Sequence, residues 1–141
     1  MNKVYYSEDQ INQMIDELIE KIQSSGECFT QVIGIKNGGI PISTRIAQIL
    51  NVAHTPVRIS HYVGDTKRQS PVVHTADIPN GHVLVVDDLV DTGATMSTFY
   101  HYFGNHGMIA VLFWNTRAQP KPDFYVQEKP DAWIVFPWEK E

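Results

Sequence analysis

A run of four apolar residues, Val83–Val86, ends in two adjacent aspartates, Asp87 and Asp88. A strand with apolar side chains on both faces is typical of the middle of a parallel sheet that helices cover on both sides. After the aspartates, a turn of small residues leads at Thr95 into a segment that predicts a helix to about His106. A buried strand, a turn and a helix form half of a βαβ unit, so the sequence predicts an α/β fold.

Helices and strands alternate along the rest of the chain. Ser7 and Gln10 form a capping box before a helix that ends at Gly26, and a second helix is expected from about Pro41 to Leu50. Their inward faces are expected to be Ile11, Met14, Ile15, Leu18, Ile19 and Ile22, and then Ile42, Ile46, Ile49 and Leu50. Strands are expected at Gln31–Ile35, Val57–Ser60, Val72–His74, His82–Asp87, Met108–Phe113, Phe124–Val126 and Trp133–Phe136. This alternation predicts a single domain over residues 1–141, with a doubly wound, mostly parallel sheet and flanking helices.

Composition narrows the class of protein. The 141 residues are 43% hydrophobic, which is enough to bury a core. The net charge of −5 argues against nonspecific electrostatic binding to nucleic acid, whose phosphate backbone is also negative. The single cysteine, Cys28, excludes an internal disulfide and fits a reducing compartment. Acidic residues near the start argue against a secretory signal, and no apolar run is long enough to span a bilayer. We therefore expect a cytoplasmic protein that binds neither nucleic acid nor membrane.

The turn before the third predicted helix has the composition of an anion-binding site. The N–H groups of Thr92–Thr95 would point outward at a helix N-terminus, where the helix dipole favours negative charge. Gly93 and Ala94 leave room for a phosphate to approach the main chain, and two threonine hydroxyls can donate further hydrogen bonds. The sequence therefore predicts a phosphate site here.

Three carboxylates lie beside this predicted site, and like charges repel strongly where water is scarce. The conflict disappears if the backbone binds the phosphate while Asp87 and Asp88 bind neutral hydroxyls or Mg²⁺, which takes one or two carboxylates together with substrate oxygens. A phosphorylated ribose offers this combination. In a simpler alternative, Asp91 and Thr92 only cap a helix and the acidic pair is a solvated strand end. The complete string, with a strand before it and a helix after it, favours the ligand site.

Ligands of open parallel sheets bind beyond the carboxyl ends of the strands. The loops that matter are therefore Lys36–Gly39, Asp87–Thr95 and the segment after Phe113. The polar stretch His61–Ser70 predicts an exposed, mobile loop over about residues 61–71 that could close over the site.

The segment from Val85 to Thr95, Val-Val-Asp-Asp-Leu-Val-Asp-Thr-Gly-Ala-Thr, resembles the 5-phosphoribosyl-1-pyrophosphate (PRPP) signature of the type I phosphoribosyltransferases. Val32–Pro41 is similar to the pyrophosphate-binding turn of that family. Trp133–Glu139 resembles the base-binding end of the xanthine–guanine branch and its archaeal purine relatives. The resemblance covers nearly the whole chain and implies the family's fold, with a base-binding segment over about residues 114–141.

The resemblance also implies a role for each matching residue. The PRPP-binding residues would be Lys36, Asn37, Gly38, Gly39, Arg68, Asp87, Asp88, Asp91, Thr92, Gly93, Ala94 and Thr95, with Asp91 as the catalytic acid or base. The base-binding residues would be Asn115, Trp133 and Ile134, and the Mg²⁺ contacts would be Asp88 and Glu139.

Two positions depart from the family pattern. Asn37 stands where the pyrophosphate turn usually has an arginine, although Lys36 supplies a charge one position earlier. Asn115 stands where the purine branch has a lysine that contacts the 6-oxygen of the base. An asparagine amide offers that position both a donor and an acceptor.

The function that these features imply is transfer of the 5-phosphoribosyl group from PRPP to a 6-oxopurine (hypoxanthine, guanine or xanthine), with release of pyrophosphate, as in purine salvage. The alternative is a non-catalytic regulatory protein that senses PRPP or a nucleotide on the same fold. Relatives in the family are commonly oligomers, so a homodimer or homotetramer is expected.

Overall fold

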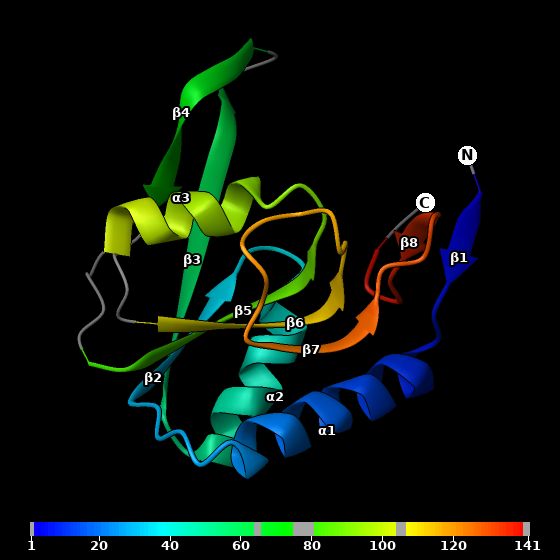
Figure 1. The fold of residues 1–141 in the computed structure, drawn as a ribbon, viewed down its shortest axis with the longest axis vertical. Coiled ribbons are helices and arrows are strands. Elements are labelled where there is room, and N and C mark those ends of the chain that lie inside the picture. Colours follow the sequence, from blue (N-terminus) through cyan, green and yellow to red (C-terminus); the bar gives the residue numbers. More distant parts are fainter. Residues whose placement is uncertain (1, 64–65, 75–80, 104–106, 140–141) are drawn as a thin grey trace.

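A computed structural model of the chain describes residues 2–63, 66–74, 81–103 and 107–139, and their side chains except at 60–63, 66–74 and 101–103. The elements are β1 (Lys3–Tyr5), α1 (Glu8–Ser24), β2 (Gln31–Ile35), α2 (Ile40–Leu50), β3 (Ala53–Val63), β4 (Thr66–His74), β5 (Val83–Val90), α3 (Ala94–Phe103), β6 (Gly107–Trp114), β7 (Phe124–Glu128) and β8 (Trp133–Val135). Six strands form one sheet, with α1 and α2 on one face and α3 on the other (Figure 1). The predicted α/β fold is confirmed.

The sheet has the strand order β4-β3-β2-β5-β6-β7, and every pair in it is parallel except β3 with β4. The chain first builds outward from β2 to β3 and then returns to place β5 on the other side of β2. The crossover helices α2 and α3 consequently lie on opposite faces (Figure 1). This reversal makes the gap beyond the carboxyl ends of β2 and β5 the topological switch point, where open α/β sheets bind ligands.

Strand β5 shows how the apolar run fills both layers. Leu84 and Val86 pack into the core under α1 and α2, whereas Val83 and Val85 pack into the core under α3. All four side chains are at most 1% exposed. Because a strand alternates its side chains between faces, only a run that is apolar throughout can fill both cores.

The helices follow their predicted patterns with one exception. In α1 the capping box between Ser7 and Gln10 is present, and the six residues expected to face inward are all buried. In α2, Ile42 and Ile46 are fully buried, but Ile49 is 54% exposed. The expectation that Ile49 faces inward is therefore wrong, although this residue follows the buried Ile46 by three positions.

Two segments differ from the expected secondary structure. The polar stretch expected as a loop contributes to an antiparallel pair, β3 with β4, with a register shift between Ser60 and Tyr62. Its expected mobility lies outside what the structure describes. Near the chain start, β1 pairs in parallel with β8 as a separate two-stranded sheet, which the sequence did not indicate. None of the described helices is long and apolar enough to cross a membrane.

Candidate active site

The two loops at the switch point lie against each other. Gly38 approaches the carboxylate of Asp88 so closely that a Cβ atom on this glycine would fall 2.0 Å from Oδ2. A Cβ on Gly39 would meet the carbonyl oxygens of Val86 at 2.6 Å and Ile35 at 2.7 Å. A side chain at Gly39 would therefore clash with the backbone, and one at Gly38 would displace the Asp88 carboxylate, so the backbone of this turn lies directly beside β5. The N–H groups of Asn37 and Gly38 donate to no other described residue, so they are available to an anionic ligand.

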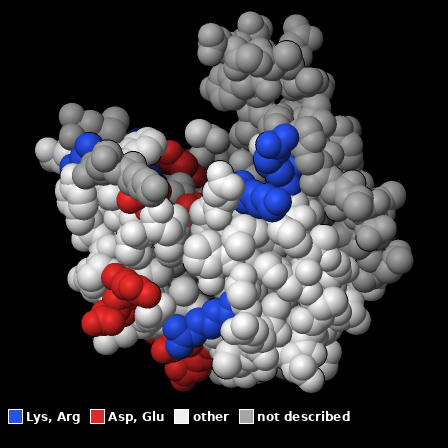
Figure 2. Space-filling view, turned by 180° about the vertical axis from the view of Figure 1, so that it is seen from behind, with Lys and Arg blue, Asp and Glu red and all other residues white. Residues whose placement is uncertain are grey.

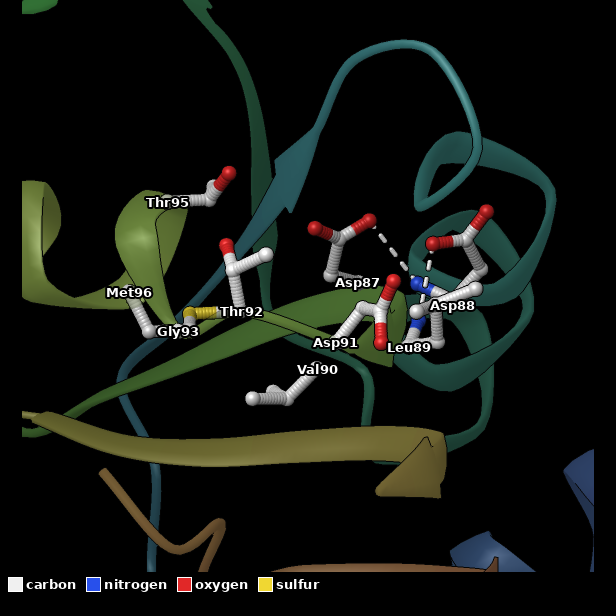
Figure 3. Close-up of a pocket in the computed structure, with 9 residues that line it drawn as sticks. All are labelled: Asp87, Asp88, Leu89, Val90, Asp91, Thr92, Gly93, Thr95 and Met96. Carbon is white, nitrogen blue, oxygen red and sulfur yellow. Dashed lines mark hydrogen bonds between the residues drawn. The ribbon is translucent and has the colours of Figure 1, made fainter. Parts of the chain in front are cut away.

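Asp87 and Asp88 form a partly buried acidic pair at the end of β5 (Figure 3). One carboxylate oxygen of Asp87 accepts the Asp88 N–H at 2.8 Å, and one of Asp88 accepts the Leu89 N–H at 2.7 Å. Burial raises the pKa of both carboxyl groups, and the charge of Asp88 raises the pKa of Asp87 further. Neither makes an ion pair with a described Lys or Arg. The pair is therefore a site of uncompensated negative charge when ionised.

The turn from Asp91 to Gly93 forms the wall opposite this pair. Thr92 Oγ1 accepts the Ala94 N–H at 3.2 Å, and Gly93 adopts a left-handed backbone conformation with φ of +85°. The N–H groups of Thr92 and Gly93 donate to no other described residue. They lie at the N-terminus of α3, where the helix dipole favours an anion.

These residues enclose one cavity of about 230 Å³ (Figure 3). It is lined by Asp87, Asp88, Leu89, Val90, Asp91, Thr92, Gly93, Thr95 and Met96. Carboxylates on one side and free backbone donors on the other match a ligand that carries both hydroxyls and a phosphate.

Asp91 is exposed, and its partner comes from another strand. The side-chain amide of Asn115, directly after β6, donates to the Asp91 backbone carbonyl at 3.0 Å and to its Oδ1 at 3.1 Å. The side-chain oxygen of Asn115, Oδ1, accepts the backbone N–H of Arg117 at 3.1 Å. This bridge between the ends of β5 and β6 was not predicted from the sequence, because no local pattern shows that the two residues meet.

The segment that follows β6 also supports the turn Asp91–Gly93, which we call the phosphate turn after the phosphate site that the sequence predicts there. A Cβ on Gly93 would fall 1.7 Å from the backbone oxygen of Gln119, and the Trp114 indole N–H donates to the Ala118 carbonyl at 3.3 Å. Sequence analysis missed Gln119 because it acts through its main chain, which leaves no signature in residue type.

Two of the expected base-binding residues, Trp133 and Ile134, lie on β8 in the separate two-stranded sheet. Trp133 opens β8 and is 55% exposed, whereas Ile134 is buried. The Lys129 ammonium group donates to the carbonyls of Pro130 and Ala132, which fixes the turn before Trp133. A second cavity of about 230 Å³ lies between this turn and the end of β6, lined by Asn115, Thr116, Arg117, Glu128, Lys129, Pro130 and Asp131.

The donor set of the acidic pair fits Mg²⁺. Two oxygen ligands without a basic partner suit a hard cation that completes its shell with substrate oxygens. No group of three or more His, Cys, Asp and Glu side chains in the described part of the chain could hold a metal without such help. Glu139, the other expected ligand, is exposed and does not line the cavity of Asp88.

The structure thus brings together most of the expected PRPP residues, from the turn after β2 and from Asp87–Thr95. Lys36 and Asn37 are both exposed on the former turn. Arg68 lies on β4, but its side chain is outside the described residues. Trp133 and Ile134 do not line the cavity at the acidic pair.

Comparison with known proteins identifies the family. Residues 2–141 match the model of the phosphoribosyl transferase domain. The chain is similar in structure to a purine phosphoribosyltransferase from Pyrococcus horikoshii, with 29% identity and a TM-score of 0.86 over 100% of this chain and 96% of that one. A protein from Neisseria gonorrhoeae with bound ppGpp is 25% identical, with a TM-score of 0.80 over 99% and 90% of the chains. The xanthine-guanine-hypoxanthine phosphoribosyltransferase of Helicobacter pylori shares the fold at 19% identity, with a TM-score of 0.80 over 98% and 94%. The switch-point cavity and these matches lead to one conclusion: the chain belongs to the phosphoribosyltransferase family of transferase enzymes.

Proposed function

We propose that this enzyme transfers the 5-phosphoribosyl group of PRPP to a 6-oxopurine and releases pyrophosphate. The observation that carries the proposal is the cavity at the switch point, where backbone donors at the N-terminus of α3 face the carboxylates of Asp87 and Asp88. A sugar phosphate needs donors for the phosphate and acceptors for its hydroxyls, and the cavity offers both.

Each part of PRPP has a corresponding part of the site. The 5′-phosphate binds the turn from Asp91 to Thr95, and the ribose hydroxyls donate to Asp87 and Asp88. The pyrophosphate binds the turn Lys36–Gly39, whose backbone lies against the Asp88 carboxylate. The family resemblance adds Arg68 as a further pyrophosphate contact, although its side chain lies outside the described residues. Asp88 would hold Mg²⁺, which would supply positive charge against the pyrophosphate, whereas Glu139, the other expected ligand, lies outside the lining of this cavity.

The reaction needs positioning and electrostatic stabilisation and no covalent nucleophile. The bond between C1 of the ribose and the pyrophosphate oxygen breaks as a purine nitrogen bonds to C1. Pyrophosphate leaves with the electron pair, and positive charge develops on the ribose near Asp87, Asp88 and Asp91. Asp91 accepts the proton that the purine nitrogen loses.

The base-binding part rests on the C-terminal segment. Trp133, which is 55% exposed, offers a free aromatic face for stacking, and the main chain of Ile134 meets the 2-position of the purine. The similarity to a purine phosphoribosyltransferase at 29% identity supports a purine as acceptor.

A panel of bases tests this proposal. Purified protein is incubated with PRPP, Mg²⁺ and one of hypoxanthine, guanine, xanthine, adenine, orotate or uracil, and pyrophosphate release is measured. We expect turnover with at least one 6-oxopurine and a lower kcat/KM for adenine and both pyrimidines. A clear preference for adenine or a pyrimidine would contradict the choice of base but not the PRPP site.

The second candidate is a nucleotide-sensing regulator without efficient catalysis. One observation favours it: a relative at 25% identity has bound ppGpp. Tight binding of PRPP or ppGpp without pyrophosphate release from any base would support this alternative. Nucleic acid is not favoured as its partner, because Lys and Arg lie in small separate groups on the face shown in Figure 2.

We also propose a cytoplasmic location, since the free cysteine Cys28 is exposed and suits a reducing compartment. A homodimer or homotetramer is proposed because relatives in the family are commonly oligomers, and sedimentation of the purified protein tests this oligomeric state.

A further inference from the structure

The side-chain amide of Asn115 has a defined orientation. Its Oδ1 faces the Arg117 N–H at 3.1 Å, and a backbone N–H can only donate, so the atom facing it must be the oxygen. The NH₂ group therefore faces Asp91, where both of its acceptors lie, the backbone carbonyl at 3.0 Å and Oδ1 at 3.1 Å.

These contacts leave Asn115 little capacity to bind a base. An asparagine side chain has two donor hydrogens and two acceptor lone pairs. Three of these four positions are used within the protein. Turning the NH₂ group toward a purine 6-oxygen would break both bonds to Asp91.

Asp91, in contrast, needs a partner to be held in place. It is exposed and follows the last residue of β5, so packing does not fix its side chain. A general base must lie within hydrogen-bond reach of the proton that it accepts, and small errors in its position lower the rate strongly. One amide that holds both the main chain and Oδ1 of Asp91 defines the direction of the carboxylate, and it leaves Oδ2 without a described partner to accept the proton.

We propose that Asn115 is a positioning residue for Asp91 and does not select the base through its 6-position. This inference rests on the proposed function, in which Asp91 accepts the purine proton. The loop after β6 is a suitable support for this task, because its Gln119 carbonyl also lies directly against Gly93 of the phosphate turn. The same loop therefore sets the position of both the phosphate turn and the proton acceptor.

Two variants separate this role from a structural one. Asn115→Ala removes every side-chain bond, whereas Asn115→Asp keeps an oxygen to accept the Arg117 N–H, loses the donors to Asp91 and places a second carboxylate beside it. We expect both variants to lower the single-turnover rate by about tenfold or more, which corresponds to about 1.4 kcal/mol. The Kd for PRPP and for the base should change less than about threefold, because neither ligand loses a direct contact. Gln48→Ala, which truncates an exposed side-chain amide on α2, serves as the matched control and should retain the wild-type rate.

Two further measurements complete the test. The ratio of kcat/KM for hypoxanthine to that for adenine should be the same in wild type and Asn115→Ala. In an Asp91→Ala background, Asn115→Ala should cause no additional loss of rate. A changed base ratio, a higher Kd for the base with an unchanged rate, additive losses, or a wild-type rate in Asn115→Asp would each overturn the positioning role. If the wild type releases no pyrophosphate with any base, the proposed function fails instead.

Discussion

Asp87 is held in surroundings that disfavour its charge. Burial and the neighbouring carboxylate of Asp88 raise its pKa above the ordinary value of 3.8. The folded chain thus holds this proton more tightly than the unfolded chain. The protonated Asp87 side chain contributes to the free energy of unfolding in full below about pH 3.8, and this contribution is lost as pH rises through the raised pKa of the folded state. Buried neighbouring carboxylates are typical of a binding site, because a bound ligand or cation offsets the unfavourable burial and repulsion of their charges.

We therefore predict that Asp87→Asn stabilises the ligand-free protein at neutral pH while weakening PRPP binding. The amide oxygen can still accept the Asp88 N–H, and the unpaired charge is removed. The free energy of unfolding at pH 8 should rise on the order of 1 kcal/mol, the usual size of a single-site effect, because the amide carries no charge into this buried place. Urea denaturation at pH 5 and pH 8 measures this, with the exposed Asp131→Asn as control. A loss of stability at pH 8 would show that the charge of Asp87 is already compensated.

Asp91 differs from the pair in that it is exposed. We predict that Asp91→Asn lowers kcat by about 10²–10⁴-fold, the usual contribution of a general acid or base. The Kd of PRPP, measured by calorimetry, should change little, because the backbone donors of the turn remain. The surface variant Asp16→Asn is the control. Near-native turnover in Asp91→Asn would exclude a proton-transfer role.

At the level of elements, the phosphate turn depends on its close approach to the loop after β6. We predict that Gly93→Ala prevents PRPP binding, since a Cβ would fall 1.7 Å from the Gln119 oxygen. Gly26→Ala is a matched control: this glycine has a similar φ of +76° but nothing within 4 Å of an added Cβ. The left-handed backbone should cost each variant about 1 kcal/mol of stability, and the clash with Gln119 should cost Gly93→Ala more. Only Gly93→Ala should also raise the Kd of PRPP, and equal Kd values in the two variants would contradict the steric argument.

Elements whose residues face a core were predictable, and elements defined by distant pairing were not. The bounds of β2 and the inward face of α1 follow from the sequence because burial imposes a period on residue type. Strand β5 runs three residues beyond the predicted Asp87, because polar residues at the ligand end interrupt the apolar pattern without ending the strand. Strand β1 has three residues and exists through its pairing with β8, about 130 residues away, so no local pattern reveals it. The polar stretch His61–Ser70 predicts a loop for a different reason: β3 and β4 pair locally through their backbones, and this stretch has no apolar pattern that would indicate a strand.

The parts of the candidate site that lie at strand ends were predictable, and the contacts between its loops were not. The acidic pair, the phosphate turn and Gly38 are adjacent to strand ends, so topology alone brings them together. The contact of Asn115 with Asp91 depends on the side-chain conformations of two loops, and residue type does not encode it.

For the whole molecule, the site is strongly acidic in a protein whose net charge is already −5. PRPP carries further negative charge, so we predict that Mg²⁺ is required for productive binding. Calorimetry with Mg²⁺ and with a chelator should differ by at least tenfold in the Kd of PRPP, while inorganic phosphate should bind weakly in both. Equal affinity for PRPP in the chelator would show that the protein itself neutralises the ligand.

The parallel pairing of β1 with β8 bears on how the protein is labelled in the laboratory. The Trp133 N–H donates to the Asn2 carbonyl at 2.9 Å, so the beginning of the chain runs beside the aromatic residue proposed to stack on the base. A purification tag or fluorescent protein fused ahead of Lys3 would be tethered next to Trp133, where its bulk competes with the base for space. A small environment-sensitive dye at the same position would instead report base binding through its emission, without a change to any residue of the phosphate turn.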